Sequence, residues 1–148
     1  MTTKHDLLTP AAVRAELAST PSSVRTARAL VTTALRRWPH LRDRGALLVT
    51  ELATNAVLHA GSTFVVEVAV TTDAVRIAVS DTSPVVPKRK RHGAEAGTGR
   101  GLGLVALLSS ASGCDRHDGT YRKTVWCELP LDPAALSEPD EGALLATG

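Results

Sequence analysis

The chain has 148 residues, and 43% of them are hydrophobic while only 3% are aromatic, so it can form one domain with a core of Leu, Val and Ala. Its 17 basic and 15 acidic side chains leave a formal net charge of +2, which gives no reason to expect nucleic-acid binding. A membrane-spanning helix needs about 18 uninterrupted apolar residues, and no stretch of the chain approaches this length. The N-terminus also lacks the charged and then apolar segments of a secretory signal peptide. We therefore expect a cytoplasmic protein that binds neither nucleic acid nor membrane.

The first third of the chain predicts helices. Ala11–Leu17 show a short helical pattern within an N-terminal arm or accessory helix at 1–20. A firmer helix is predicted over 22–38, where apolar residues recur at helical spacing, and Pro39 is expected to end it. The next helix is predicted from Leu41 to Ala60, with Gly61 after it as its stop.

Two strands with alternating apolar residues come next, at 64–70 and 75–79, with Thr72-Asp73 as the turn between them. Residues 82–100 then predict a long loop that includes the basic run Lys88–Arg91. A loop longer than about 15 residues in a compact domain is usually functional or disordered. The basic run is interpreted as a solvated part of this loop, since no aromatic residues are interleaved with it.

The last part of the domain predicts a helix over Leu102–Ser112, closed by Gly113. A hairpin turning near Asp118-Gly119 and a final strand over Thr124–Leu129 follow. The tail at 131–148 has little to bury and is expected to be disordered.

This order of elements predicts an α+β two-layer sandwich, with a largely antiparallel sheet and three main helices on one face. The domain is expected to span 21–130. Cys114 and Cys127 are expected to be buried free thiols, and a disulfide between neighbouring strands stays open as the alternative.

The predicted helix over 41–60 carries the first candidate site. Glu51, Asn55 and His59, each four residues apart, lie along the side opposite to its apolar face. A carboxylate and a carboxamide one turn apart could bind a hydrated Mg²⁺, and the carboxylate could accept a proton from an attacking hydroxyl. The alternative is an ordinary amphipathic helix, with His59 as a favourable helix-end residue.

Asp81 is the second candidate, because it continues the inward register of the strand before it. A buried carboxylate is costly without a partner, and this one could accept a hydrogen bond from an exocyclic amine such as that of adenine. The alternative is that Asp81 only starts the turn at Thr82-Ser83-Pro84.

The third candidate is the glycine run Gly97–Leu104, which leads into a helix. Glycines permit close backbone approach, free N–H groups at a helix start favour phosphate, and Arg100 could add a charged contact. The run is neither a Walker A motif nor a dinucleotide-binding turn.

Four blocks in this order resemble the GHKL-type ATPase family of histidine kinases, type II topoisomerases, heat-shock chaperones and MutL. The blocks are E-L-A-T-N-A-V-L-H-A at 51–60, V-S-D at 79–81, G-R-G-L-G-L-V at 99–105 and K-T-V-W at 123–126. Within that family the chain looks most like the stand-alone, actinobacterial-looking anti-sigma-factor serine/threonine kinases, and the resemblance covers about residues 21–130. It implies the Bergerat-type ATP-binding fold.

The resemblance also implies roles for matching residues. Asn55 would coordinate Mg²⁺ on the phosphates of ATP, and Glu51 would be the general base. The nucleotide would be bound by Asp81, at the adenine amine, by Thr124 in support of it, and by the glycine run with Gly99, Arg100, Gly101, Leu102 and Gly103. The loop 82–100 would act as a lid.

The implied reaction transfers the γ-phosphate to a serine or threonine of an anti-anti-sigma antagonist protein, and the implied partners are that antagonist, a sigma factor and a second copy of the chain. One departure is that Thr82-Ser83-Pro84 stand where the wider family has glycines after its aspartate. The alternative function is therefore a catalytically weak or inactive nucleotide-binding module that acts by occupying its partner.

Overall fold

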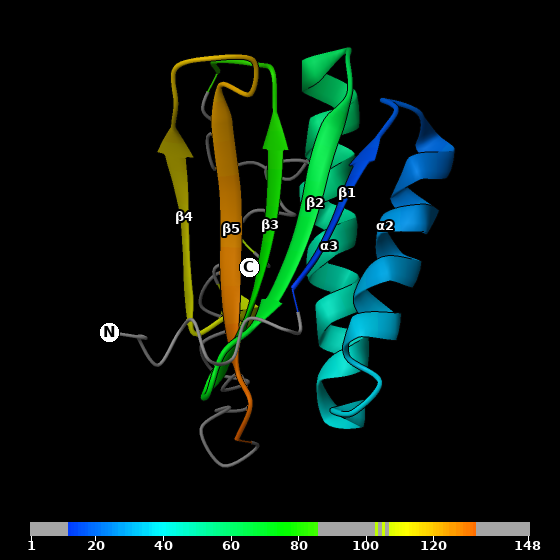
Figure 1. The fold of residues 1–148 in the computed structure, drawn as a ribbon, viewed down its shortest axis with the longest axis vertical. Coiled ribbons are helices and arrows are strands. Elements are labelled where there is room, and N and C mark those ends of the chain that lie inside the picture. The colour runs from blue at the N-terminus through cyan, green and yellow to red at the C-terminus, as the bar shows by residue number, and fades with distance from the viewer. Residues whose placement is uncertain (1–11, 86–102, 104, 106, 133–148) are drawn as a thin grey trace.

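The computed structural model describes residues 12–85, 103, 105 and 107–132 (Figure 1). Two helices and five strands have defined bounds in this part of the chain. In sequence order they are β1 (Val13–Leu17), α2 (Pro21–Ala34), α3 (Pro39–Ala60), β2 (Phe64–Val70), β3 (Ala74–Asp81), β4 (Ala111–Arg116) and β5 (Lys123–Pro130).

The strands form one antiparallel sheet in the order β1-β2-β3-β5-β4, and Figure 1 shows α2 and α3 next to each other, with α3 behind β1 and β2 and α2 at the right. The α+β architecture is thus confirmed. The expected third helix is not confirmed as an element, because only Gly103, Val105, Leu107 and Leu108 of it are described, and these four are helical.

The helical pattern expected at Ala11–Leu17 is wrong, because Val13–Leu17 form strand β1 and pair with 64–68 of β2. In these five residues apolar and charged side chains also alternate, which is the pattern of a strand. Val13, Ala15 and Leu17 share the register of the buried residues of β2, while Arg14 and Glu16 alternate with them. The sheet therefore begins before residue 21.

The helix predicted over 22–38 ends earlier, at Ala34, and Pro39 begins α3 instead of ending the helix before it. Proline suits the first helical position, because its missing N–H would have no partner there. The predicted stop of α3 is confirmed, since Gly61 adopts the left-handed conformation with φ of 69°.

Gly45 brings the two helices close together. A Cβ on this residue would lie 2.7 Å from Leu35 Cδ1 and 3.1 Å from Val31 Cγ1. The core between the helix layer and the sheet is aliphatic, as composition predicts. Its largest fully buried side chains are Val31, Leu35, Leu41, Leu48, Val49, Leu52, Phe64, Val66, Val68, Ile77 and Leu129. Among the described residues, no helix is both long and apolar enough to cross a membrane.

The β2–β3 and β4–β5 hairpins turn where the sequence predicts, and Gly119 has a φ of 109° in the second turn. The helix expected to reach Ser112 does not, because β4 begins at Ala111 and Gly113 lies inside this strand. A Cβ on Gly113 would lie 2.8 Å from the indole ring of Trp126. Gly113 is thus required by the ring across the sheet and does not close a helix.

Cys114 and Cys127 are both free, as expected. Burial raises the pKa of the Cys127 thiol to about 12, and burial is also the main cause that raises the pKa of Cys114. The two thiols are therefore protonated and unreactive at neutral pH.

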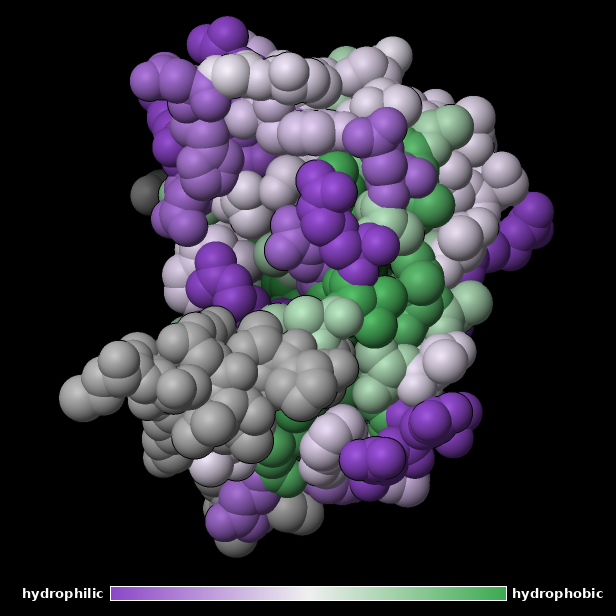
Figure 2. Space-filling view, in the orientation of Figure 1, coloured by the Kyte–Doolittle hydropathy of each residue, from purple (hydrophilic) through white to green (hydrophobic). Residues whose placement is uncertain are grey.

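The sheet face away from the helices carries polar and charged side chains. Arg76 lies 4.4 Å above the ring of Trp126 and forms ion pairs with Glu128 at 3.6 Å and Asp115 at 3.9 Å. Figure 2 shows hydrophilic side chains over this face, with a hydrophobic area on the side where β1 and β2 lie. The charged groups of β3 and β5 on this face are thus largely paired with one another.

Candidate functional site

Helix α3 presents two of the predicted site residues on a half-buried surface. Asn55 is buried, with 6% of its surface exposed, and Glu51 one turn earlier is half-buried. Burial raises the pKa of the Glu51 carboxyl above its ordinary value. His59 is exposed at the end of the helix, which agrees with its interpretation as a helix-end residue. This side of α3 is thus partly removed from water.

The Asn55 carboxamide lacks a partner. Its Nδ2 atom is buried and has no hydrogen-bond acceptor among the described residues. Buried polar side-chain atoms are nearly always paired, so an unpaired donor needs a specific explanation. A ligand with oxygen atoms at this place would supply one. This observation favours the site interpretation of α3 over that of an ordinary amphipathic helix.

Asp81 points inward, as its register predicts, and its partner is Lys123 at the start of β5. Lys123 Nζ lies 2.9 Å from Asp81 Oδ1, and each of the two residues is only 3% exposed. The same Oδ1 accepts the N–H of Ser83 at 2.9 Å, so Asp81 also starts the predicted turn. Asp81 is therefore both an inward-facing carboxylate and the start of the turn, and its contact with adenine stays a prediction.

Lys123 is the residue that sequence reasoning missed. The signal for it lies in β5, where Lys123, Val125, Cys127 and Leu129 are buried in alternation. A lysine in the inward register of a strand needs a carboxylate nearby, because a buried ammonium is costly alone. Asp81 is the acid that β3 places directly opposite.

The chain path puts Asp81 and the C-terminal half of α3 at the same end of the fold. Residues 61–63 connect α3 to β2, and Phe64, the first residue of β2, pairs with Asp81. The hydroxyls of Ser62 and Thr82 are hydrogen-bonded, which joins the loop after α3 to the turn after β3. Asn55 and the Asp81–Lys123 pair thus border the same end of the helix–sheet interface.

Thr124 is not brought to Asp81, which corrects its predicted supporting role. Neighbouring residues of a strand point to opposite faces, so Thr124 points away from the face of Lys123 and Asp81. Its hydroxyl lies 2.7 Å from Ser80 Oγ and 2.8 Å from His117 Nε2. It belongs to the sheet face that points away from the helices.

Most of the glycine run lies outside the described residues, namely Gly99, Arg100, Gly101 and Leu102. The loop predicted as a lid also lies outside them from residue 86 onward. Gly103 is described and helical, and a Cβ there would meet no atom within 4 Å. Neither packing within the described chain nor a left-handed backbone angle therefore requires this glycine.

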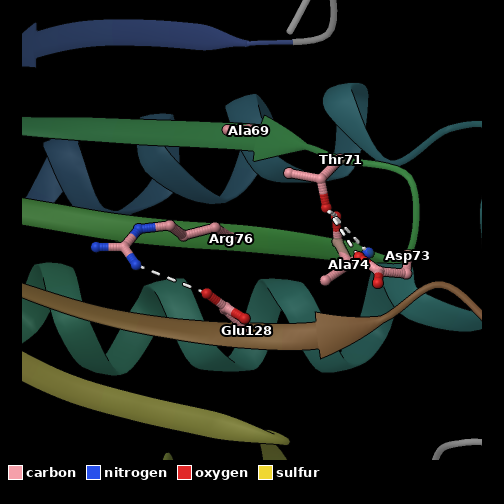
Figure 3. Close-up of a pocket in the computed structure, with 6 residues that line it drawn as sticks. All are labelled: Ala69, Thr71, Asp73, Ala74, Arg76 and Glu128. Atoms are coloured by element: carbon pink, nitrogen blue, oxygen red, sulfur yellow. Dashed lines mark hydrogen bonds and ion pairs between the residues drawn. The ribbon is translucent and has the colours of Figure 1, made fainter. Parts of the chain in front are cut away.

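A surface hollow at the opposite end of β3 does not add to the site. It has a volume of about 390 Å³ and is lined by Ala69, Thr71, Asp73, Ala74, Arg76 and Glu128 (Figure 3). Figure 3 shows Arg76 and Glu128 pointing toward each other across the strands, and their ion pair occupies the charges that a ligand would need. The hollow is a feature of the polar sheet face.

The described residues contain no group of three or more His, Cys, Asp or Glu side chains that could hold a metal ion. A metal at Asn55 would therefore need most of its ligands from phosphate and water, which is the coordination that Mg²⁺ commonly keeps. In such a shared site Asn55 would supply one oxygen, Oδ1, while its unpaired Nδ2 would be free to donate to a phosphate oxygen.

Two comparisons with known proteins bear on this arrangement. A search of curated proteins found no match to the chain. The family model described as the histidine kinase-like ATPase domain matches residues 17–127, which is more than half of the chain. The matched region includes α3, Asp81, the glycine run and Lys123. The chain therefore belongs to the family of histidine kinase-like ATPase domains, an ATP-binding fold.

Proposed function

We propose that this protein binds Mg-ATP between the C-terminal half of α3 and the glycine run, and that it is a serine/threonine kinase. Its substrate would be an antagonist protein of the anti-anti-sigma type, and it would also sequester a sigma factor. The observation that carries the proposal is the buried, unpaired carboxamide of Asn55, one helical turn after the half-buried Glu51. Membership of an ATP-binding family supports it.

The residues that would hold the nucleotide divide by chemistry. The Asn55 carboxamide offers an oxygen to Mg²⁺ and an N–H to a phosphate oxygen. Asp81 offers carboxylate oxygen to the amine of adenine. Backbone N–H groups of Gly99, Gly101 and Gly103 would face the phosphates, with Arg100 as a charged contact. Bound ATP would supply the γ-phosphate, and a metal ion held by Asn55 and the phosphates would neutralise their negative charge.

Glu51 is suited to accept the proton of a serine or threonine hydroxyl. Its raised pKa, which results from burial, makes the carboxylate a stronger base than an exposed glutamate. Its place one turn before Asn55 puts the base beside the proposed metal ligand.

Phosphate transfer tests this assignment directly. The protein is incubated with Mg-ATP and candidate antagonist proteins, and phosphoserine or phosphothreonine is detected by mass spectrometry. Glu51→Gln is expected to slow transfer by roughly a hundredfold or more, the usual contribution of a general base.

Glu67→Gln is the matched control, because Glu67 lies on the sheet face that points away from the helices and pairs with Arg14 at 3.6 Å. If Glu51→Gln transfers phosphate at the wild-type rate, Glu51 is not the general base. An absence of transfer to every candidate, with ATP bound, would favour the second function below.

A binding module without catalysis is the second candidate, favoured by the Asp81 carboxylate. Lys123 and Ser83 satisfy Asp81 Oδ1 within the chain, so the fold does not depend on a nucleotide at this place. The two functions are separated by titrating ATP into the protein in a calorimeter and by measuring capture of candidate sigma factors with and without ATP. Capture that needs no nucleotide, together with no phosphate transfer to any candidate, would establish the module, and the heat of ATP binding shows whether it also holds nucleotide.

A further inference from the structure

We propose that Lys123 is a base-recognition residue. In this proposal, which depends on the proposed ATP binding, Asp81 and Lys123 together bind the edge of adenine. Asp81 accepts the exocyclic amine, and Lys123 donates a hydrogen bond to the adjacent ring nitrogen, N1. The inference concerns a residue that the motif of Glu51, Asn55 and Asp81 does not include.

The hydrogen bonds of the pair leave one acceptor and one donor available. Asp81 uses Oδ1 for both of its hydrogen bonds, to Lys123 Nζ and to the N–H of Ser83, each at 2.9 Å. Within the described residues Oδ2 has no hydrogen bond. Lys123 Nζ carries three N–H groups and has two acceptors there, Asp81 Oδ1 and the carbonyl oxygen of Ser83 at 3.3 Å.

The ion pair does not need to open for a base to bind. Its two residues are each 3% exposed, and separating such a pair would leave a buried charge without a partner. The free Oδ2 allows the amine of a base to bind while Lys123 stays on Oδ1. The ammonium group therefore remains beside the bound base and must face a hydrogen-bond acceptor of it.

Adenine offers the complementary pattern on one edge, since its exocyclic amine is a donor and the adjacent N1 is an acceptor. Two positions of the turn after β3 offer no backbone donor for N1. The N–H of Ser83 is already used by Asp81, and Pro84 has no N–H. Lys123 is the charged donor that hydrogen-bonds to Asp81 among the described residues.

Nucleotide analogues test the proposal with the unaltered full chain. Dissociation constants are measured by calorimetry for ATP, for 1-deaza-ATP, which lacks N1, and for 7-deaza-ATP, which keeps it. A hydrogen bond from a charged donor predicts that 1-deaza-ATP binds about ten- to a hundredfold more weakly than ATP. The affinity for 7-deaza-ATP is expected to stay within about threefold of ATP.

Variants then assign this difference to the lysine. Lys123→Met is expected to bind ATP and 1-deaza-ATP with nearly equal affinity, whereas Lys123→Gln, which keeps a neutral donor, is expected to retain part of the preference. Arg14→Met is the matched control, because it also removes a cation from an ion pair, but on the sheet face that points away from the helices. It should keep the full preference for ATP.

The outcomes separate this proposal from the one on which it depends. If the wild-type protein binds no ATP, both proposals are wrong. If it binds ATP and 1-deaza-ATP equally well, ATP binding stands and the role of Lys123 is overturned. Tighter ATP binding by Lys123→Met than by wild type would also overturn it, because the lysine would then compete with the base. The analogue comparison needs no variant and holds even if Lys123→Met fails to fold.

Discussion

Two buried side-chain nitrogens among the described residues have no hydrogen-bond acceptor, Asn55 Nδ2 and Trp126 Nε1. The indole ring of Trp126 packs against Gly113 and lies 4.4 Å below the guanidinium of Arg76, which offsets the cost of its unpaired nitrogen. Among the residues that the structure describes, Asn55 Nδ2 has neither a hydrogen-bond acceptor nor such a ring contact. A residue that lowers the stability of the fold in this way is expected to be retained for binding.

This reasoning predicts the behaviour of Asn55→Ala. Removal of the unpaired donor offsets the lost packing of the side chain, so the free energy of unfolding should change by less than about 1 kcal/mol. The rise in Tm caused by Mg-ATP should disappear. Thermal unfolding with and without Mg-ATP measures both effects, and Thr54→Ala is the control that keeps the response. A large loss of stability without nucleotide would show that Asn55 is a structural residue.

Glu51 leads to a prediction about pH. Burial raises its pKa in the folded protein, so folding favours the protonated carboxyl, and this contribution is lost as the pH rises through the folded pKa. Glu51→Gln removes the ionised group and should raise Tm slightly at pH 7, on the order of one degree since the side chain is half-exposed. At pH 4 the two proteins should unfold at nearly the same temperature. A destabilised Glu51→Gln at pH 7 would contradict this assignment of the pKa.

At the scale of elements, α3 and the β2–β3 hairpin could be predicted because their local signals agree. Apolar residues recur at helical spacing over a long segment before Gly61. On both sides of the Thr72-Asp73 turn, apolar residues stand at every second position, as in strands. The β1 segment could not be predicted, since five residues fit two periods and only pairing with β2 selects the strand. Pro39 begins α3 where the sequence predicts a helix end, because proline is compatible with both a helix end and a helix start.

Gly113 shows an element boundary that depends on a distant residue. A glycine after a helical pattern usually ends the helix, yet here it leaves room for Trp126 in β5. We expect Gly113→Ala to lower the free energy of unfolding by about 1–3 kcal/mol, because the rigid ring must move. Denaturant unfolding measures this, and tryptophan emission reports the displaced ring. Ser112→Ala, at the neighbouring exposed position, should change stability by less than about 0.5 kcal/mol.

At the scale of the whole molecule, the site depends on strands that are distant in sequence. Helix spacing and strand register make Glu51, Asn55 and Asp81 candidates, and the order of the sequence blocks selects them as a predicted site. Lys123 could not be identified in this way, because its pairing with Asp81 requires β5 to lie beside β3, 42 residues away. The alternation of side chains along β5 also explains why Thr124 does not reach Asp81. Lys123 points to the face of Asp81, so its neighbour Thr124 points to the other face. Sequence thus predicts the residues carried by single elements better than those added by the assembled sheet.

Metal dependence is the last prediction, and it concerns the folded protein as a whole. Because the described residues contain no acidic or histidine cluster for a metal, Mg²⁺ should bind only together with the phosphates of ATP. Mg²⁺ alone should leave Tm unchanged. Mg-ATP at about 100 times its Kd should stabilise the fold by about 2.7 kcal/mol, a rise in Tm on the order of ten degrees. A chelator added to the ATP complex should remove most of that rise. Stabilisation by Mg²⁺ without nucleotide would show that the protein holds a metal by its own ligands, and Asn55 would then not act through shared coordination.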